Sequence, residues 1–140
     1  MNALQYGFLS ELQKIATDRA ATAREVKAIL HGYLKSQKLD PNKAVLLAGG
    51  SMYFHGMKDH ITDIDFLHPD LPAMFKKQVG KYELDGGPGA GASPAVWESE
   101  EKYGLRIQTP RALLAFYKML NRPKDQEKIK FLEARLRGGR

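Results

Sequence analysis

Two short segments constrain this chain more than any other feature. One is an apolar run that ends in two glycines and a serine, Leu46–Ser51, and the other is an alternating Asp-x-Asp-apolar segment, Asp63–Phe66. Residues 44–48 are continuously apolar, which predicts a short strand buried on both faces. The glycines then predict a turn into a short helix over 51–57. Strand, glycine turn and helix therefore follow in the order that a phosphate-binding site requires.

The two carboxylates fall on a second predicted strand, Thr62–His68. Because side chains alternate along a strand, Asp63 and Asp65 share one face, and Ile64 and Phe66 take the other. Neighbouring carboxylates repel each other, and a bound divalent cation relieves that repulsion. The pair therefore predicts a site for Mg²⁺ or Mn²⁺ in which Asp63 and Asp65 are both metal ligands and catalytic residues.

The two motifs together favour a nucleotide site. Nucleotidyl transfer requires that the charge of a triphosphate be neutralised and that a nucleophile be aligned with the leaving pyrophosphate, and carboxylate-held metal ions do both. Gly49 and Gly50 would let the backbone approach phosphate oxygens, and Ser51 would donate a hydrogen bond to them. Each motif alone is weak evidence, because Gly-Gly turns also serve as hinges and most surface Asp pairs bind nothing. Their order and spacing favour the functional interpretation.

The remaining pattern predicts a mixed α/β (α+β) fold in a single domain, 1–140. A sheet core of about four to five strands is expected over 44–108, between an N-terminal helical hairpin over 1–40 and C-terminal helices over 110–137. The hairpin is expected because two apolar sets at helical spacing lie on either side of Asp18. These sets are Leu4, Phe8, Leu9, Leu12 and Ile15, and then Val26, Ile29, Leu30, Tyr33 and Leu34.

Within the core, Pro69, Asp70 and Pro72 are typical of a helix start and predict a helix through about Val79. Short strands are expected after it, over 81–85, 95–99 and 105–108. Thr109 and Pro110 are ordinary start signals for the next helix, which Asn121-Arg122-Pro123 breaks. These elements complete a small mixed sheet with helices at both ends of the chain.

Composition limits the class of protein and of partner. With 43% hydrophobic and 27% charged residues the chain resembles an ordinary globular protein, and no run approaches the ~18 apolar residues of a membrane span. The N-terminus lacks the features of a signal peptide, so a cytoplasmic location is expected. A net charge of +6 favours a polyanionic partner, such as RNA or an acidic macromolecule, although it also fits a solubilising surface.

The residues quoted above resemble the signature of the polymerase β-like nucleotidyltransferase superfamily: two small residues, about a dozen positions, and then Asp-x-Asp on a strand. The match runs from Leu47 through Gly56 and then over Thr62–Phe66. A second block, from Leu105 to Asp125, is similar to the downstream segment of the abortive-infection toxin branch of that superfamily. The resemblance implies a minimal nucleotidyltransferase fold and a nucleoside triphosphate as donor.

Residue by residue, the resemblance implies that Ser51 contacts the triphosphate and that Asp63 and Asp65 hold the metal. It also implies that Lys118 contacts phosphate and that Asp125 is a polar partner near the nucleotide. The spacing agrees in part, because Arg111, Lys118 and Arg122 can share one cationic helix face, which places Arg122 among the nucleotide-binding residues. The alternative is that Lys118 and Arg122 are solvated and that Asp125 complements the dipole of the last helix.

The superfamily also has a third carboxylate on a later strand, which acts as general base or completes the metal shell. Glu98, on the strand expected over 95–99, is preferred here for its position relative to the downstream block. Asp85, on the preceding strand, is the alternative. If neither points into the site, nucleotide binding could survive without catalysis.

Two functions follow from the sequence. The first is a metal-dependent nucleotidyltransferase that moves a nucleoside monophosphate from the triphosphate to a hydroxyl. Its acceptor would be an RNA, such as a tRNA end, a protein or a small molecule. The second is a non-catalytic domain of the same type that serves as a binding or structural subunit of a larger assembly. The short chain and the uncertain third carboxylate keep the second function open.

Overall fold

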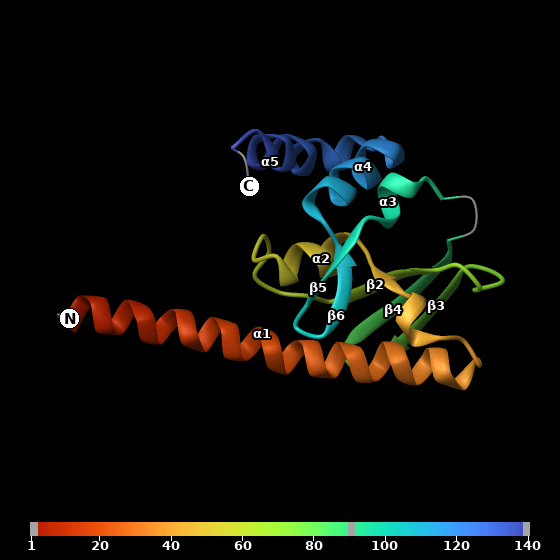
Figure 1. Ribbon diagram of the computed structural model, residues 1–140, viewed down its shortest axis with the longest axis horizontal. Coiled ribbons are helices and arrows are strands. Elements are labelled where there is room, and N and C mark those ends of the chain that lie inside the picture. The colour runs from red at the N-terminus through yellow and green to blue at the C-terminus, as the bar shows by residue number, and fades with distance from the viewer. Residues whose placement is uncertain (1–2, 90–91, 139–140) are drawn as a thin grey trace.

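The chain folds as an α/β protein, a computed structural model of which describes residues 3–89 and 92–138. A mixed sheet lies between the N-terminal helix, α1, on one face and the C-terminal helices α4 and α5 on the other (Figure 1). The α/β class with flanking helices is therefore confirmed. The described sheet has six strands rather than the four to five expected, in the order β3-β4-β2-β1-β6-β5.

The bounds of the elements are as follows. The strands are β1 Val45–Leu46, β2 Asp63–His68, β3 Phe75–Val79, β4 Tyr82–Pro88, β5 Ser99–Lys102 and β6 Leu105–Gln108. The α-helices are α1 Ala3–Ser36, α2 Ala48–Phe54, α3 Pro94–Trp97, α4 Pro110–Leu120 and α5 Gln126–Arg137. Two 3₁₀ turns, η1 Pro41–Lys43 and η2 Pro123–Asp125, complete the described elements. No helix of the described residues is both long and apolar enough to cross a membrane.

Strand pairing brings two acidic segments level with each other. β2 runs antiparallel to β1 and parallel to β4, and β1 runs parallel to β6. In the β2–β4 pair, Asp63 is opposite Glu83 and Asp65 is opposite Asp85. Side chains of one strand alternate between faces, so all four of these carboxylates point to the same face of the sheet. That face is the one that α4 and α5 cover.

The sheet separates two apolar clusters. On one face, α1 buries a stripe against the strands: Ala23, Val26, Leu30 and Leu34 pack with Ile64, Phe66, Leu84 and Ile107. On the other face, α4 and α5 bury Leu113, Tyr117, Ile129 and Leu132 against Val45, Leu47 and Met52. The acidic residues of β2 and β4 lie beyond the edge of this second cluster, where the helices leave the sheet accessible.

The expected N-terminal hairpin is wrong, because α1 is one continuous helix of 34 residues. No glycine or proline interrupts residues 8–31, and both apolar sets fall on the same helical stripe, so nothing stops the helix at Asp18. The first half of α1 extends beyond the sheet (Figure 1), and there Leu12 and Ile15 are 46% and 41% exposed. Residues 1 and 2 lie outside the described part of the chain.

Two elements of the core also differ from expectation. Residues 75–79 form strand β3 instead of a helix, because Gly80, with a φ of +59°, closes a tight turn that pairs β3 with β4. Residues 94–97 form the short helix α3 instead of a strand. The Ser93 hydroxyl accepts a hydrogen bond from the backbone amide of Ala95, and Pro94 occupies the first helical position. Both are typical features of a helix start.

Candidate functional site

A cavity of ≈ 400 Å³ opens above the acidic residues of β2 and β4. Its polar lining divides by charge into four carboxylates and five cations. The carboxylates are Asp63, Asp65, Glu83 and Asp85, and the cations are Lys58, Lys76, Arg122, Lys124 and Lys128. All four carboxylates come from strands β2 and β4, and three of the cations come from the segment between α4 and α5 and from α5 itself. Opposite charges therefore meet across one solvent-accessible space.

Asp65 is the carboxylate whose environment is most unfavourable for a negative charge. Burial, together with repulsion from Asp85, Asp63 and Glu83, raises the pKa of Asp65 to about 6, while Lys76 opposes the shift. A cation placed between Asp65 and its neighbours would relieve this repulsion. Site electrostatics therefore favour a bound positive charge.

Lys76, on the edge strand β3, already supplies part of that charge. Its Nζ lies 3.3 Å from Glu83 and 3.8 Å from Asp85. The ammonium side chain is 64% exposed, so it can move aside for a ligand at little cost. Lys76 thus balances part of the charge of Glu83 and Asp85, the two cavity-lining carboxylates of β4.

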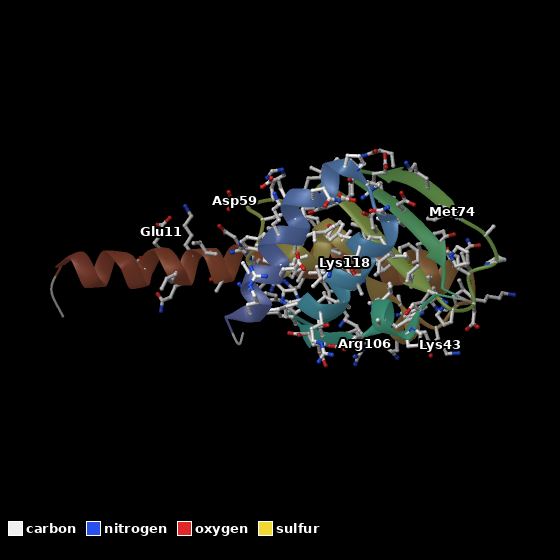
Figure 2. The ribbon with its side chains drawn as sticks, turned by 90° about the horizontal axis from the view of Figure 1, so that it is seen from above. Glu11, Lys43, Asp59, Met74, Arg106 and Lys118 are labelled. Carbon is white, nitrogen blue, oxygen red and sulfur yellow. The ribbon has the colours of Figure 1, made fainter. Side chains whose placement is uncertain are left out.

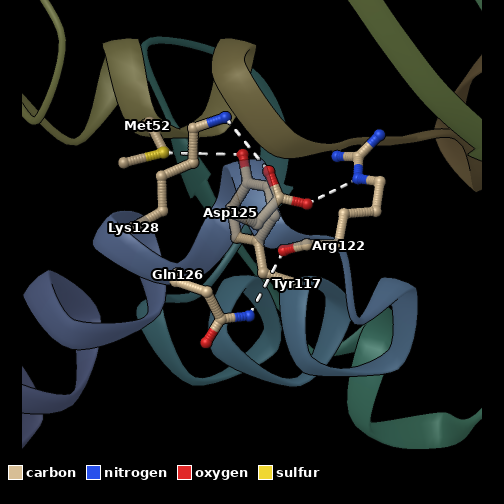
Figure 3. A network of polar contacts seen from close by, with 6 residues as sticks. All are labelled: Met52, Tyr117, Arg122, Asp125, Gln126 and Lys128. Carbon is tan, nitrogen blue, oxygen red and sulfur yellow. Dashed lines mark hydrogen bonds and ion pairs between the residues drawn. The ribbon is translucent and has the colours of Figure 1, made fainter.

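Three residues at the α4–α5 junction form a fixed cationic wall (Figure 3). The Asp125 carboxylate is fully buried and accepts hydrogen bonds from Arg122 Nε at 2.5 Å and from Lys128 Nζ at 3.4 Å. Burial alone would raise the pKa of Asp125, but these two cations lower it, so Asp125 stays ionised. Asp125 thus lies behind the cavity and orients two cations that line it.

Tyr117 of α4 forms the apolar back of the same wall. Its ring is buried, with Lys128 Nζ 5.1 Å from the ring centroid, and its hydroxyl donates to the Met52 sulfur at 3.6 Å (Figure 3). Burial, with further repulsion from Asp125 and Asp65, raises the pKa of Tyr117 to about 12. The phenol is therefore neutral at physiological pH.

Gly49 and Gly50 lie in the first turn of α2, which begins at Ala48, so the predicted glycine turn before a helix over 51–57 is wrong. Of the two glycines, Gly49 approaches the cavity closely, as predicted. A β-carbon on Gly49 would lie 3.1 Å from Lys58 Nζ, and one on Gly50 would lie 3.0 Å from the Leu46 side chain. Gly49 lines the cavity with Ala48, which adopts a left-handed φ of +52°. Gly50 instead allows α2 to pack tightly on β1. Only the first glycine therefore presents backbone to the cavity.

Ser51 lies elsewhere than the resemblance implied. Its side chain is fully buried, and its hydroxyl donates to the Leu46 carbonyl at 2.6 Å and accepts from the Gln108 amide at 3.1 Å. Both hydrogen-bonding roles of the hydroxyl are used to join α2 to β1 and β6. In this structure Ser51 fixes the first turn of α2 against the sheet rather than contacting the cavity.

Lys118 and Glu98 also lie outside the cavity lining. Lys118, on α4 (Figure 2), forms an ion pair with Glu133 of α5 at 3.3 Å, while Arg122 lies past the end of α4 and turns toward the cavity. Lys118 and Arg122 therefore do not share one cationic face. Glu98 follows α3 and accepts a hydrogen bond from the Thr109 hydroxyl at 2.9 Å. The carboxylate beside Asp65 is Asp85, the alternative, and not Glu98.

Several lining residues had no assignment from the sequence. Lys128 follows Asp125 by three positions, a spacing that places two residues on one side of a helix, and this was the available signal for Lys128. Lys124, next to Asp125 in the 3₁₀ turn η2, had no such signal. No sequence signal indicated Lys58, Lys76 or Glu83. Their position in the cavity lining depends on how β3 and the loop before β2 fold back toward the sheet.

The donor set fits Mg²⁺ or Mn²⁺ only in combination with a ligand. Carboxylate oxygens are hard donors suited to these ions, and Asp63 and Asp65 are neighbours on one face. Across residues 3–89 and 92–138, however, no three His, Asp or Glu side chains are placed to hold a metal ion by themselves. Mg²⁺ commonly uses one or two carboxylates and completes its shell with phosphates and water. Asp63 and Asp65 suit this mode of Mg²⁺ binding.

Comparison of the chain with protein-family models, with curated proteins and with solved structures found no match.

Proposed function

We propose that this cavity binds a nucleoside triphosphate with Mg²⁺ and transfers its nucleoside monophosphate group to a hydroxyl. The observation that carries the proposal is the cavity itself, in which carboxylates of β2 and β4 face cations from the α4–α5 junction. A metal–triphosphate complex has the matching distribution, with a divalent cation at one end of a polyanion. The resemblance of the Gly-Gly-Ser and Asp-x-Asp segments to a nucleotidyltransferase signature adds independent support.

In this proposal Asp63 and Asp65 hold the metal and Asp85 is the third carboxylate. When bound, the metal neutralises charge on the triphosphate and orients its α-phosphate. Arg122, Lys124 and Lys128 bind the outgoing pyrophosphate, and Asp125 keeps two of these cations in place. The Gly49 backbone allows the phosphates to approach the start of α2 closely.

The test is transfer of label from α-³²P nucleoside triphosphates, with Mg²⁺ or Mn²⁺, to total cellular RNA, to protein or to small hydroxyl compounds. We expect labelled product with the wild-type chain and at least a hundredfold less with Asp65→Asn. Asp70→Asn is the matched control, because Asp70 pairs with Lys43 at the surface, 3.2 Å away, and lines none of this site. Equal labelling by wild type and Asp65→Asn would refute the proposal.

Three observations favour a second candidate, a non-catalytic domain of the same type within a larger assembly. Ser51 uses its hydroxyl inside the protein, and Lys76 stands beside Asp85 where a catalytic carboxylate would be expected to be free. The projecting half of α1 also offers apolar side chains to a partner. Tight nucleotide binding without label transfer to any acceptor class, from a folded protein, would favour this candidate over the first.

A further inference from the structure

The connection between α2 and β2, residues 55–62, joins the helix that begins at the glycines to the strand that begins at Asp63. Three of its residues line the cavity of the proposed function: Lys58, Ile61 and Thr62. Gly56 turns the chain after α2 with a φ of +79°, and residues 57–62 belong to no helix or strand. A segment of this kind needs contacts from elsewhere in the molecule to fix its position.

Lys58 is the cation that this connection contributes to the cavity. Its Nζ lies close to the backbone of Gly49, since a β-carbon on Gly49 would be only 3.1 Å away from it. Other cations of the lining, such as Arg122 and Lys128, are held by ion pairs of their side chains. No ion pair between described residues includes Lys58. The position of its ammonium group therefore depends on where the main chain places residue 58.

Arg19 of α1 holds the main chain on both sides of this turn. Its Nε donates a hydrogen bond to the Tyr53 carbonyl at 3.1 Å, and its Nη2 donates to the Lys58 carbonyl at 3.2 Å. The Tyr53 carbonyl lies in the last turn of α2, where carbonyls lack partners within the helix. The guanidinium carbon also lies 5.1 Å from the centroid of the Tyr53 ring. One side chain of α1 therefore joins the end of α2 to the backbone of Lys58.

The guanidinium group suits this contact better than an ammonium group would. Its N–H groups point in fixed directions within one plane, so two carbonyls that it binds together are held at a fixed separation. Arg19 is half-buried, and with Asp59 it lines a small cavity of ≈ 160 Å³ beside α1 (Figure 2). Arg19 itself is absent from the lining of the larger cavity, which the Lys58 side chain enters. Arg19 therefore acts on that cavity only through the connection.

We propose that Arg19 is a positioning residue of the nucleotide site, and that it holds the α2–β2 connection so that the Lys58 ammonium group meets a phosphate of the donor. This inference rests on the proposed function. The attraction between an ammonium group and a phosphate falls as their separation grows, so a displaced connection weakens binding although Lys58 is still present. The helix α1, which covers the opposite face of the sheet, thereby takes part in phosphate binding.

The test is titration calorimetry of tripolyphosphate with Mg²⁺, at low ionic strength, on wild type, Arg19→Ala, Lys58→Ala and the double variant. We expect each single variant to bind at least about threefold more weakly than wild type. We expect the double variant to be at most about 1.5-fold weaker than Lys58→Ala, because the lysine that Arg19 positions is already absent. Multiplication of the two single effects would overturn the inference, as would wild-type binding by Arg19→Ala.

Two further variants separate the contact from the charge of Arg19. Arg24→Ala is the matched control, since Arg24 is exposed on the same helix and lines none of the cavity, and we expect it to bind like wild type. A loss equal to that of Arg19→Ala would assign the effect to net charge and overturn the inference. Arg19→Lys serves if Arg19→Ala does not fold. It keeps the charge without the two directed donors, so we expect weakened binding, and wild-type binding would overturn the inference.

Hydrogen–deuterium exchange of residues 55–62, measured without ligand, distinguishes this inference from the function on which it rests. We expect Arg19→Ala to raise the exchange rate of these amides at least about threefold and Arg24→Ala to leave it unchanged. Unchanged exchange in Arg19→Ala would show that Arg19 does not hold the connection. If exchange rises as expected but tripolyphosphate does not bind the wild type, the proposed function is wrong, and the role of Arg19 in phosphate binding is refuted with it.

Discussion

At the scale of single residues, the electrostatics of Asp65 describe the site most directly. Its carboxyl is partly buried and lies among Asp85, Asp63 and Glu83, which together with burial bring its pKa to about 6. Such a carboxyl is destabilising when ionised in the absence of a counter-ion. A site that holds this arrangement in its folded state gives up stability for the capacity to bind a cation.

Asp65→Asn should therefore stabilise the metal-free protein at alkaline pH. Between pH 3.8 and about 6 the folded chain retains a proton that the unfolded chain has lost, so the stability contribution of Asp65 falls as pH rises through this window. We expect the free energy of unfolding to rise by about 1–2 kcal/mol at pH 8, a value reduced for solvent screening, and to change little near pH 3.5. Urea denaturation in chelator-containing buffer measures the free energy of unfolding at both pH values. A loss of stability at pH 8 would contradict this account.

Some site residues could be predicted from sequence, and the reason others could not is physical. The alternation of a strand is local, so the shared face of Asp63 and Asp65 followed from their spacing. The partners of Ser51 are the Leu46 carbonyl and the Gln108 amide, and the second is 57 residues away in the chain. Whether a hydroxyl points inward depends on such distant pairing. The preference for Glu98 was wrong for a related reason. Glu98 was expected on a strand over 95–99, but residues 94–97 form helix α3 and Glu98 lies at its C-terminal end.

At the scale of elements, the junction between α4 and α5 decides which cations face the cavity. Asn121 ends α4 with a left-handed φ of +49°, and this turn redirects the chain so that Arg122 and Lys128 meet around Asp125. Lys118, one turn earlier, faces Glu133 instead. Sequence spacing alone treats these cations as equivalent, because it does not include the change of direction.

The two lysines should therefore differ in phosphate binding. Lys118 and Lys128 are each in one ion pair, at 3.3 and 3.4 Å, and Lys128 also lies over the Tyr117 ring, so Lys118→Ala controls for the loss of a helix lysine and its ion pair. We expect Lys128→Ala to weaken tripolyphosphate binding at least threefold at low ionic strength and Lys118→Ala to change it less than twofold. Calorimetry of both variants measures this. The reverse order would place phosphate on the Lys118 side, as the family resemblance implied.

The helix α1 consists of a half packed on the sheet and a half that projects from it (Figure 1). Its periodicity predicted helix correctly, and the absence of glycine and proline over 8–31 is the local signal for one long helix that the predicted break at Asp18 overlooked. The β3–β4 hairpin was missed for a different reason, because Phe75–Val79 acquires its strand partners only through the turn at Gly80.

Two leucines test this division of α1. Leu30 is 3% exposed and Leu12 is 46% exposed on the same helix. We expect Leu30→Ala to lower the free energy of unfolding by about 2–4 kcal/mol and Leu12→Ala to change it by less than about 0.5 kcal/mol. Chemical denaturation at two protein concentrations provides the values. A cost for Leu12→Ala comparable to that of Leu30→Ala would show that the projecting half is packed.

At the scale of the whole molecule, the two faces of the sheet differ in role. α1 and its apolar stripe cover one face and stabilise the fold. On the other face, α4 and α5 leave two adjoining cavities over the acidic ends of β2 and β4, one lined mainly by charged groups and one mainly by apolar groups. The class of the fold and the first of these cavities could be anticipated from sequence patterns, whereas the second depends on where α4 stops covering the sheet.

Binding of each nucleoside triphosphate in the presence of Mg²⁺, measured by titration calorimetry, shows whether the carboxylates of β2 hold a metal–triphosphate complex. We expect wild type and Asp70→Asn to bind at least one triphosphate, and the double variant Asp63→Asn/Asp65→Asn to bind it at least tenfold more weakly. We also expect Mg²⁺ alone to bind far more weakly than Mg²⁺ with triphosphate, because the described carboxylates do not complete a metal site by themselves. Equal binding of the triphosphate by wild type and the double variant would contradict the account.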